Sequence, residues 1–350
     1  MLHTQMLVVD LCCPNPEILR RAAAIIRAGG LVAFPTETVY GLGANALDAA
    51  AVARIFRAKQ RPAHDPVIVH VADVSELERI AARVPDVAWE LAARFWPGPL
   101  TLVLPKAEIV PDMVTASGPT VAVRCPNHPL ALALIRAADT PIAAPSANRF
   151  SRTSPTTAQH VWADLAGRID LILDGGPTPI GVESTVLDVS GEQPVILRPG
   201  GVTAEALAAA LGRPLAGPGA QNGAGAVLAS PGMLDRHYAP RTPLWLFSGS
   251  TAAIHAAMSV EIEAARGRGQ RVALMLAAED VQVFEGTEAE AAIVGPLDQP
   301  DEVARNLFQT MRSLDAAGVD LILARDFPSA GLGQAVRDRL RRAAARIINL

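Results

Sequence analysis

The chain has 350 residues, half of them apolar and 19% charged, and its formal net charge at pH 7 is −4. This length exceeds what one ordinary hydrophobic core requires and predicts two globular domains. The composition excludes an intrinsically disordered chain, and no apolar stretch is long enough to span a bilayer. The acidic net charge argues against nucleic-acid binding through overall charge, while a local basic groove stays compatible with it.

The N-terminus and the cysteines indicate the compartment. Residues 1–13 lack the basic leader and the small-residue cleavage site of a secretory signal. Cys12 and Cys13 are adjacent and Cys125 is alone, so the chain has neither a disulfide framework nor a zinc-ligand spacing. We therefore expect a cytoplasmic protein without a protein-bound metal site.

Lysine is rare in this chain. Lysine and arginine total 31 residues, and only Lys59 and Lys106 are lysines. A lysine in such an arginine-rich chain indicates a site that needs a compact, strongly hydrated charge, and chance is the simpler alternative for each of the two.

Helix and strand patterns alternate over residues 1–212. Asn15, Pro16 and Glu17 predict the capped start of a helix that ends before Gly29 and Gly30. Some strands follow each other with only a turn between them, which predicts a mixed sheet. The further helices are expected at 48–58, 87–95, 129–138, 157–165 and 204–211, and the strands at 31–34, 66–71, 100–104, 121–125, 142–144, 171–173, 184–189 and 195–197.

A linker and a smaller domain follow. Residues 213–240 are rich in Gly, Pro and Ala, which is typical of a linker, yet they end in the polar segment SPGMLDRHYAP. Residues 241–350 alternate again and predict a small open α/β (Rossmann-like) domain without a phosphate-loop motif. Its strands are expected at 244–247, 271–276, 292–294 and 320–324, and a helix at 334–347.

The first two polar segments lie in the first hundred residues. Residues 34–46, FPTETVYGLGANA, combine donors and acceptors with two glycines, which also suits an ordinary turn. Lys59 and Arg61 end a helix, where the helix dipole favours cations. The same pair suits a clamp for phosphate groups. His70 follows apolar residues, where a histidine is more often part of the core than a ligand.

Further polar segments come later. Residues 95–106 fit a Pro-Gly turn into a buried strand. Arg124 closes an apolar strand and needs an anion, such as a substrate carboxylate. Residues 141–161 place a Ser-Ala-Asn cluster before a helix, and helix capping explains only the threonines of this segment. Ser184 begins a strand and Arg198 ends one. The chain contains no signature of a covalent nucleophile, so these side chains suit the positioning of small anionic substrates.

The polar segments together resemble the YrdC-type threonylcarbamoyl-AMP synthases. The matches run in order over residues 34–200: FPTETVYGLGA, KQRP, PVIVHV, FWPGPLT, VAVRCPNHP, APSAN, SPT, ESTV and ILRPG. The segment SPGMLDRHYAP and residues 331–344, GLGQAVRDRLRRAA, resemble the long, two-domain form of the family.

This resemblance implies a fold and a reaction. The fold is α/β, with a twisted mixed sheet and a concave groove in residues 1–212. The substrates are L-threonine, bicarbonate or CO₂, and ATP, and the products are threonylcarbamoyl-AMP and pyrophosphate. A downstream transferase then uses the product to modify tRNA; whether tRNA contacts this chain stays open.

The resemblance also implies roles for individual residues. Lys59 and Arg61 would be catalytic. Threonine would be held by Thr38, His70, Arg124, Ser184 and the backbone at Ala144. ATP would be held by Lys59, Arg61, Asp65, Thr120, Ser146, Asn148, Ser154, Arg198 and Tyr238.

Two positions depart from the family pattern. Asp65 stands where asparagine is frequent, and a carboxylate beside phosphates is unfavourable without an intervening cation. We therefore expect Mg²⁺ to accompany ATP, and no tightly bound organic cofactor. Phe150 and Ser151 stand where the second residue is usually glycine, which predicts a less pliable loop.

Alternatives remain at this stage. The same fold also suits a carbamoyl-adenylate enzyme acting on another amine, or a noncatalytic RNA-binding module. We expect residues 230–240 to close over the ATP site as a lid, and docking of the two domains is the alternative role for them.

Overall fold

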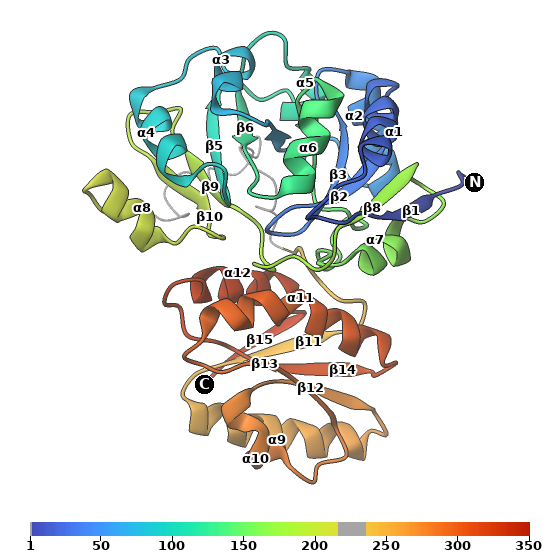
Figure 1. Ribbon diagram of the computed structural model, residues 1–350. Coiled ribbons are helices and arrows are strands. Elements are labelled where there is room, and N and C mark those ends of the chain that lie inside the picture. Colours follow the sequence, from blue (N-terminus) through green and yellow to red (C-terminus); the bar gives the residue numbers. More distant parts are fainter. Residues whose placement is uncertain (1, 216–235) are drawn as a thin grey trace. The chain divides into compact units, whose positions relative to one another are not determined.

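The computed structural model describes residues 2–215 and 236–350. The chain divides into two compact units (Figure 1). Unit 1 comprises residues 1–150 and 154–233, and unit 2 comprises residues 151–153 and 234–350. Most of the predicted linker 213–240, and residues 230–235 of the predicted lid, lie outside the described residues.

Unit 1 contains a ten-stranded mixed sheet, which confirms the mixed sheet predicted from the sequence. Both parallel and antiparallel neighbours occur along it, so no single connection type builds the sheet. Its strands, in the order in which they pair, are β1 (Gln5–Val8), β8 (Leu171–Asp174), β2 (Val32–Pro35), β3 (Tyr40–Asn45), β7 (Ile142–Ala143), β4 (Val69–His70), β6 (Thr120–Arg124), β5 (Leu100–Pro105), β9 (Thr185–Asp188) and β10 (Val195–Arg198).

The helices of unit 1 begin where the sequence predicts their caps. The Asn15 side chain accepts a hydrogen bond from the Glu17 amide at 2.9 Å, and Asp48 accepts one from the Ala50 amide at 2.8 Å. Each cap pairs an amide that the helix itself leaves unsatisfied. The helices are α1 (Pro16–Arg27), α2 (Ala49–Lys59), α3 (Leu77–Ile80), α4 (Asp86–Phe95), α5 (Asp112–Thr115), α6 (Pro129–Ala138), α7 (Ala158–Leu165) and α8 (Ala204–Leu211).

Strand alternation divides the apolar residues of unit 1 between the two faces of the sheet. One large core cluster joins strand residues to α2, α4 and α7. A second cluster, on the opposite face of β2 and β7, includes residues of α1 and α6. A small third cluster contains only non-helical residues from the other half of the sheet, namely Ile68, Val103, Ala122, Val186 and Leu197.

Unit 2 is a five-stranded parallel sheet with helices on both faces (Figure 1). This arrangement confirms the predicted open α/β domain. Its strands in pairing order are β13 (Glu290–Gly295), β12 (Val272–Ala277), β14 (Leu321–Arg325), β11 (Leu244–Ser248) and β15 (Arg346–Asn349), and its helices are α9 (Thr251–Gly267), α10 (Val281–Phe284), α11 (Pro300–Ala316) and α12 (Gly333–Ala343).

Two predicted elements differ from the structure. The strand expected at 66–71 is reduced to β4, because α5 satisfies part of the backbone before it: the Val67 amide donates to Val114 O at 2.9 Å. The helix expected at 334–347 ends at Ala343, and the β-branched residues after it form the edge strand β15 beside β11. Residues 34–46, for which an ordinary turn is one of two interpretations, form the β2–β3 hairpin with a short turn between its strands. None of the described helices is long and apolar enough to cross a membrane.

Candidate functional site

Five polar side chains alternate with the small apolar cluster along its strands. Because side chains two residues apart share a face of a strand, these polar residues lie on the same face as the cluster. We call this set the polar strand face; it consists of His70 beside Ile68, Thr120 and Arg124 beside Ala122, Thr101 beside Val103, and Ser184 beside Val186. Four of the five were predicted as site residues.

Arg124 is the central cation of the polar strand face and is almost fully buried. Its guanidinium lies 2.7 Å from the Glu37 carboxylate and donates hydrogen bonds to Thr38 Oγ1 at 3.0 Å and Gly98 O at 3.2 Å. The structure thus brings together Arg124 and Thr38, which are far apart in the sequence. A buried arginine with this fork of donors suits a carboxylate ligand.

His70 pairs with Arg124 in the register of β4 and β6, so the two side chains are neighbours. Its Nδ1 is buried and has no hydrogen-bond partner among the described residues. Burial, with a further contribution from the adjacent Arg124 cation, lowers the pKa of His70 to about 3. His70 is therefore a neutral imidazole with one ring nitrogen available to a ligand.

The depressed pKa of His70 predicts a loss of stability in acid. Native His70 takes up a proton only near pH 3, whereas an unfolded histidine does so near its ordinary value of about 6.5. Between these values the unfolded state binds more protons, so stability falls as the pH falls, by up to about 1.4 kcal/mol per pH unit. We expect His70→Gln to remove this component of the pH dependence.

Urea unfolding followed by tryptophan fluorescence measures this effect. In a Trp245→Phe background the other three tryptophans all lie in unit 1, so the signal reports that unit alone. As the pH falls from 6 to 4, the Trp245→Phe protein should lose more free energy of unfolding than the same protein with the additional His70→Gln change. Parallel pH profiles for the two proteins would contradict the prediction.

Ser184 and Arg198 form a second part of the site. Ser184 Oγ shares a hydrogen bond of 2.8 Å with Thr101 Oγ1. Arg198 donates to Ser184 O at 2.9 Å and to Ser184 Oγ at 3.3 Å. These contacts hold Ser184 beside the start of β5, where β9 and β5 run parallel. The structure therefore joins a residue predicted to bind threonine to one predicted to bind ATP.

Lys59 ends α2 as predicted, and its side chain turns into the protein with an exposure of 1%. Its ammonium group donates to the carbonyls of Ser146 and Asn148, the latter at 2.6 Å. Burial, followed by the repulsion of Arg61, lowers the pKa of Lys59 well below its ordinary value. The ammonium thus ties the predicted phosphate clamp to the loop that contains the Ser-Ala-Asn cluster.

Arg61 and Asp65 form a buried ion pair with a separation of 2.8 Å. Arg61 also donates to Asp65 O at 3.1 Å and to Pro66 O at 2.6 Å. Burial raises the pKa of the Asp65 carboxyl, while the charges of Arg61, Lys59, His64 and Arg198 act against that rise. The carboxylate that departs from the family pattern therefore lies within the electrostatic reach of the cations predicted to hold ATP.

The other lysine has a structural explanation that the sequence did not provide. The ammonium of Lys106 pairs with Asp112, whose side chain is 74% exposed. Surface pairs of this kind contribute little to stability.

The remaining predicted residues are distributed over both units. In unit 1, Ser154 Oγ donates to the carboxylate of Glu183, and the Ala144 amide donates to Ile68 O at 2.9 Å. Tyr238 belongs to unit 2, where its ring lies 5.7 Å from that of Phe308. Its predicted contact with ATP stays a prediction.

The loop that departs from the family pattern has an unusual backbone. Ser151 has a φ of 64°, in the left-handed region that glycine adopts without steric cost. This conformation explains why glycine suits the position and why serine stiffens the loop here.

Three polar side chains at the site were not predicted as site residues. Glu37, Thr101 and Glu183 all lie in the motif segments, and each is buried against a predicted residue. For Thr101 a signal was available, because its position on β5 places it two residues before Val103. Glu37 and Glu183 lie in loops, where no periodicity indicates direction.

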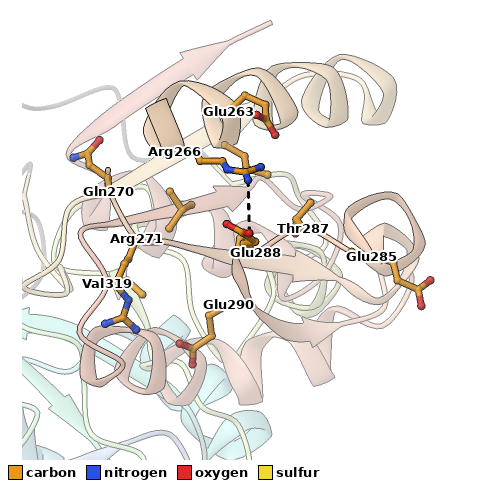
Figure 2. A pocket seen from close by; sticks show the side chains of 13 residues that line it. Glu263, Arg266, Gln270, Arg271, Glu285, Thr287, Glu288, Glu290 and Val319 are labelled. Carbon is orange, nitrogen blue, oxygen red and sulfur yellow. Dashed lines mark ion pairs between the residues drawn. The ribbon is translucent and has the colours of Figure 1, made fainter. Parts of the chain in front are cut away.

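A cavity of about 400 Å³ lies in unit 2 and contains none of the predicted site residues. Figure 2 shows it between the end of α9 and the segment before β13. Its charged side chains include Arg266 and Glu288, which form an exposed ion pair of 3.7 Å across it. Exposed, mutually paired charges of this kind are common at surfaces, so we assign no function to this cavity.

Comparisons with known proteins cover both units. Residues 24–200 match the family described as Telomere recombination, and residues 202–345 match the family described as Threonylcarbamoyl-AMP synthase, C-terminal domain. The chain is 46% identical to the threonylcarbamoyl-AMP synthase of Pyrococcus abyssi, covering 95% of this chain and 96% of that protein. It is also 46% identical to the threonylcarbamoyl-AMP synthase of Bacillus subtilis, covering 96% of each. The crystal structure of P. abyssi Sua5 complexed with L-threonine aligns with a TM-score of 0.89 and 44% identity, covering 100% of this chain and 99% of that chain.

Proposed function

The chain belongs to the threonylcarbamoyl-AMP synthase family, and from this membership we propose that it converts L-threonine, bicarbonate or CO₂, and ATP into threonylcarbamoyl-AMP and pyrophosphate. Because the AMP group of ATP is transferred to a carbamate, the enzyme is a nucleotidyltransferase by reaction class. The closest alternative within this fold is the same transfer to a carbamate of another amine.

The observation that carries the proposal is the environment of Arg124. A buried guanidinium lies beside the Thr38 hydroxyl and beside a neutral His70 with an unpartnered Nδ1. This combination supports a ligand with a carboxylate and a hydroxyl, which threonine supplies. The apolar cluster next to Arg124 suits the threonine methyl group.

The reaction requires charge stabilisation more than covalent catalysis. The neutral threonine amine attacks the carbon of CO₂, one C–O π bond opens onto oxygen, and the nitrogen releases one proton to solvent, which leaves a carbamate anion. A carbamate oxygen then attacks the α-phosphorus of ATP, the bond from that phosphorus to the bridging oxygen breaks, and pyrophosphate leaves. Negative charge develops on the phosphate oxygens during this step. We propose that Lys59, Arg61 and Arg198 stabilise that charge, because they are preorganised cations in a buried environment.

Mg²⁺ is proposed only as a companion of the ATP phosphates. Among residues 2–215 and 236–350, no group of three potential metal ligands is assembled. The Asp65 carboxylate is fully buried and paired with Arg61, so it does not fit the role of a ligand for a resident ion. A hydrated Mg²⁺ on phosphate oxygens needs no protein cage.

The proposed setting follows from the reaction. The product is an activated acyl group, so a transferase that modifies tRNA is its proposed consumer, and ATP and threonine are its proposed small-molecule partners. A cytoplasmic location is proposed because all three cysteines are free thiols.

A product assay tests the proposal. We expect pyrophosphate release from ATP to require both threonine and bicarbonate, and mass spectrometry to detect threonylcarbamoyl-AMP. Product formation from another amine in preference to threonine would identify the same-fold alternative. RNA binding without any nucleotide turnover would indicate the noncatalytic module and reject the proposal.

A further inference from the structure

The carboxylate of Glu37 is buried in the site, where one of its oxygens is in an ion pair and neither accepts a hydrogen bond from a described residue. Its residue exposure is 5%, and its Oε2 lies 2.7 Å from Arg124 Nη2. The other oxygen, Oε1, has no hydrogen-bond partner among the residues that the structure describes. Buried carboxylate oxygens are rarely left without a partner, so Oε1 marks a place for a donor that the chain itself does not supply.

The loop that contains Glu37 is held rigidly by its own polar groups. Thr36 Oγ1 donates to Val39 O at 2.7 Å and accepts from the Thr38 amide at 3.2 Å. The carbonyls of Glu37 and Thr38 accept hydrogen bonds from the amides of Ile180 and Gly181, at 3.0 and 3.2 Å. The lack of a hydrogen-bond partner at Oε1 is therefore not the result of a poorly ordered loop, because the backbone around it is hydrogen-bonded.

The charges around Oε1 define the missing donor. Arg124 is the cation that pairs with Glu37 among the described residues, and it is also the proposed receptor of the substrate carboxylate. A substrate anion placed there alone would lie close to a second anion, which is unfavourable in a buried site. A ligand with a carboxylate and an adjacent cation satisfies both side chains.

We infer that Glu37 Oε1 receives the ammonium group of the α-amino acid substrate while Arg124 receives its carboxylate. The inference rests on the proposed function. It adds the residue that selects an amino acid over a hydroxy acid that lacks the ammonium group. Glu37 thereby holds the nitrogen that later becomes the carbamate nitrogen. A ligand with a neutral group in place of the ammonium leaves the two carboxylates uncompensated and binds poorly.

Two ligands distinguish this role from a purely structural one. Threonine and 2,3-dihydroxybutanoate share the carboxylate, the side-chain hydroxyl and the methyl group, and only threonine has an ammonium. In calorimetry the unaltered protein should bind threonine at least tenfold more tightly than the analogue. In Glu37→Gln, the affinity for threonine should fall at least tenfold, while the affinity for the analogue stays the same or rises.

Matched controls complete the experiment. Glu192→Gln removes an exposed carboxylate in the same unit and should change neither affinity. Thermal unfolding reports whether Glu37→Gln is folded; if it is not, Glu37→Asp serves as the second variant and should weaken threonine selectively. Equal weakening of both ligands, or an unchanged preference for threonine, overturns the inference. An unaltered protein that makes the product but shows no preference also overturns it, whereas one that neither binds threonine nor makes the product refutes the proposed function as well.

Discussion

Replacing Lys59 by methionine should lower threonine-dependent pyrophosphate release by about 10²–10³-fold, the usual effect of removing one preorganised charge contact from a reaction centre. Methionine keeps most of the length of the side chain and removes only the charge. The ammonium also pairs the carbonyls of Ser146 and Asn148, so some loss of stability accompanies the change. Threonine affinity should stay within a few-fold of the starting value, because in the part of the chain that the structure describes the Lys59 ammonium bonds to the loop at Ser146 and Asn148 and not to the polar strand face.

The second lysine of the chain provides the control. Lys106→Met removes an ammonium whose partner, Asp112, is exposed, and this variant should retain nearly full activity. Arg61→Ala is expected to lose activity as Lys59→Met does. If Lys59→Met releases pyrophosphate at close to the original rate while folded, the assignment of Lys59 to the phosphates is wrong.

Replacing Arg124 by alanine should weaken threonine binding far more than ATP binding. Truncating one member of a buried, hydrogen-bonded charge pair typically costs about 2–5 kcal/mol, which is a loss of affinity of tens- to thousands-fold. Part of this cost arises because Glu37 is left without its counter-charge. Calorimetric titrations with threonine and with ATP measure the two affinities separately.

Arg54→Ala is the matched control for this experiment. Arg54 lies in the same unit and pairs with Asp170 at 3.0 Å, but both side chains are partly exposed and neither belongs to the site. The Arg54→Ala variant should bind threonine with unchanged affinity. Equal loss of threonine and ATP affinity in Arg124→Ala would contradict the separate roles proposed for the polar strand face and for the phosphate-binding cations Lys59, Arg61 and Arg198.

Local patterns predicted most elements because their physical causes are local. The caps at Asn15 and Asp48 depend on side chains two or three residues from the amides that they pair. The short segment at 346–349 escaped prediction for the opposite reason. Its two isoleucines continue a helical pattern in sequence, and only pairing with β11, about a hundred residues earlier, makes a strand the better arrangement.

The sequence by itself determined the mixed α/β architecture, the open domain at residues 241–350, and the family, through motifs whose order is specific. Tertiary structure alone decided which charges meet. Glu37 is joined to Arg124, and Lys59 to the carbonyls of Ser146 and Asn148, although these residues are far apart in the sequence. These pairings depend on strand register, which decides which residues become neighbours, and on burial, which strengthens interactions between charges by excluding water. The spacing of residues along the chain encodes neither of the two.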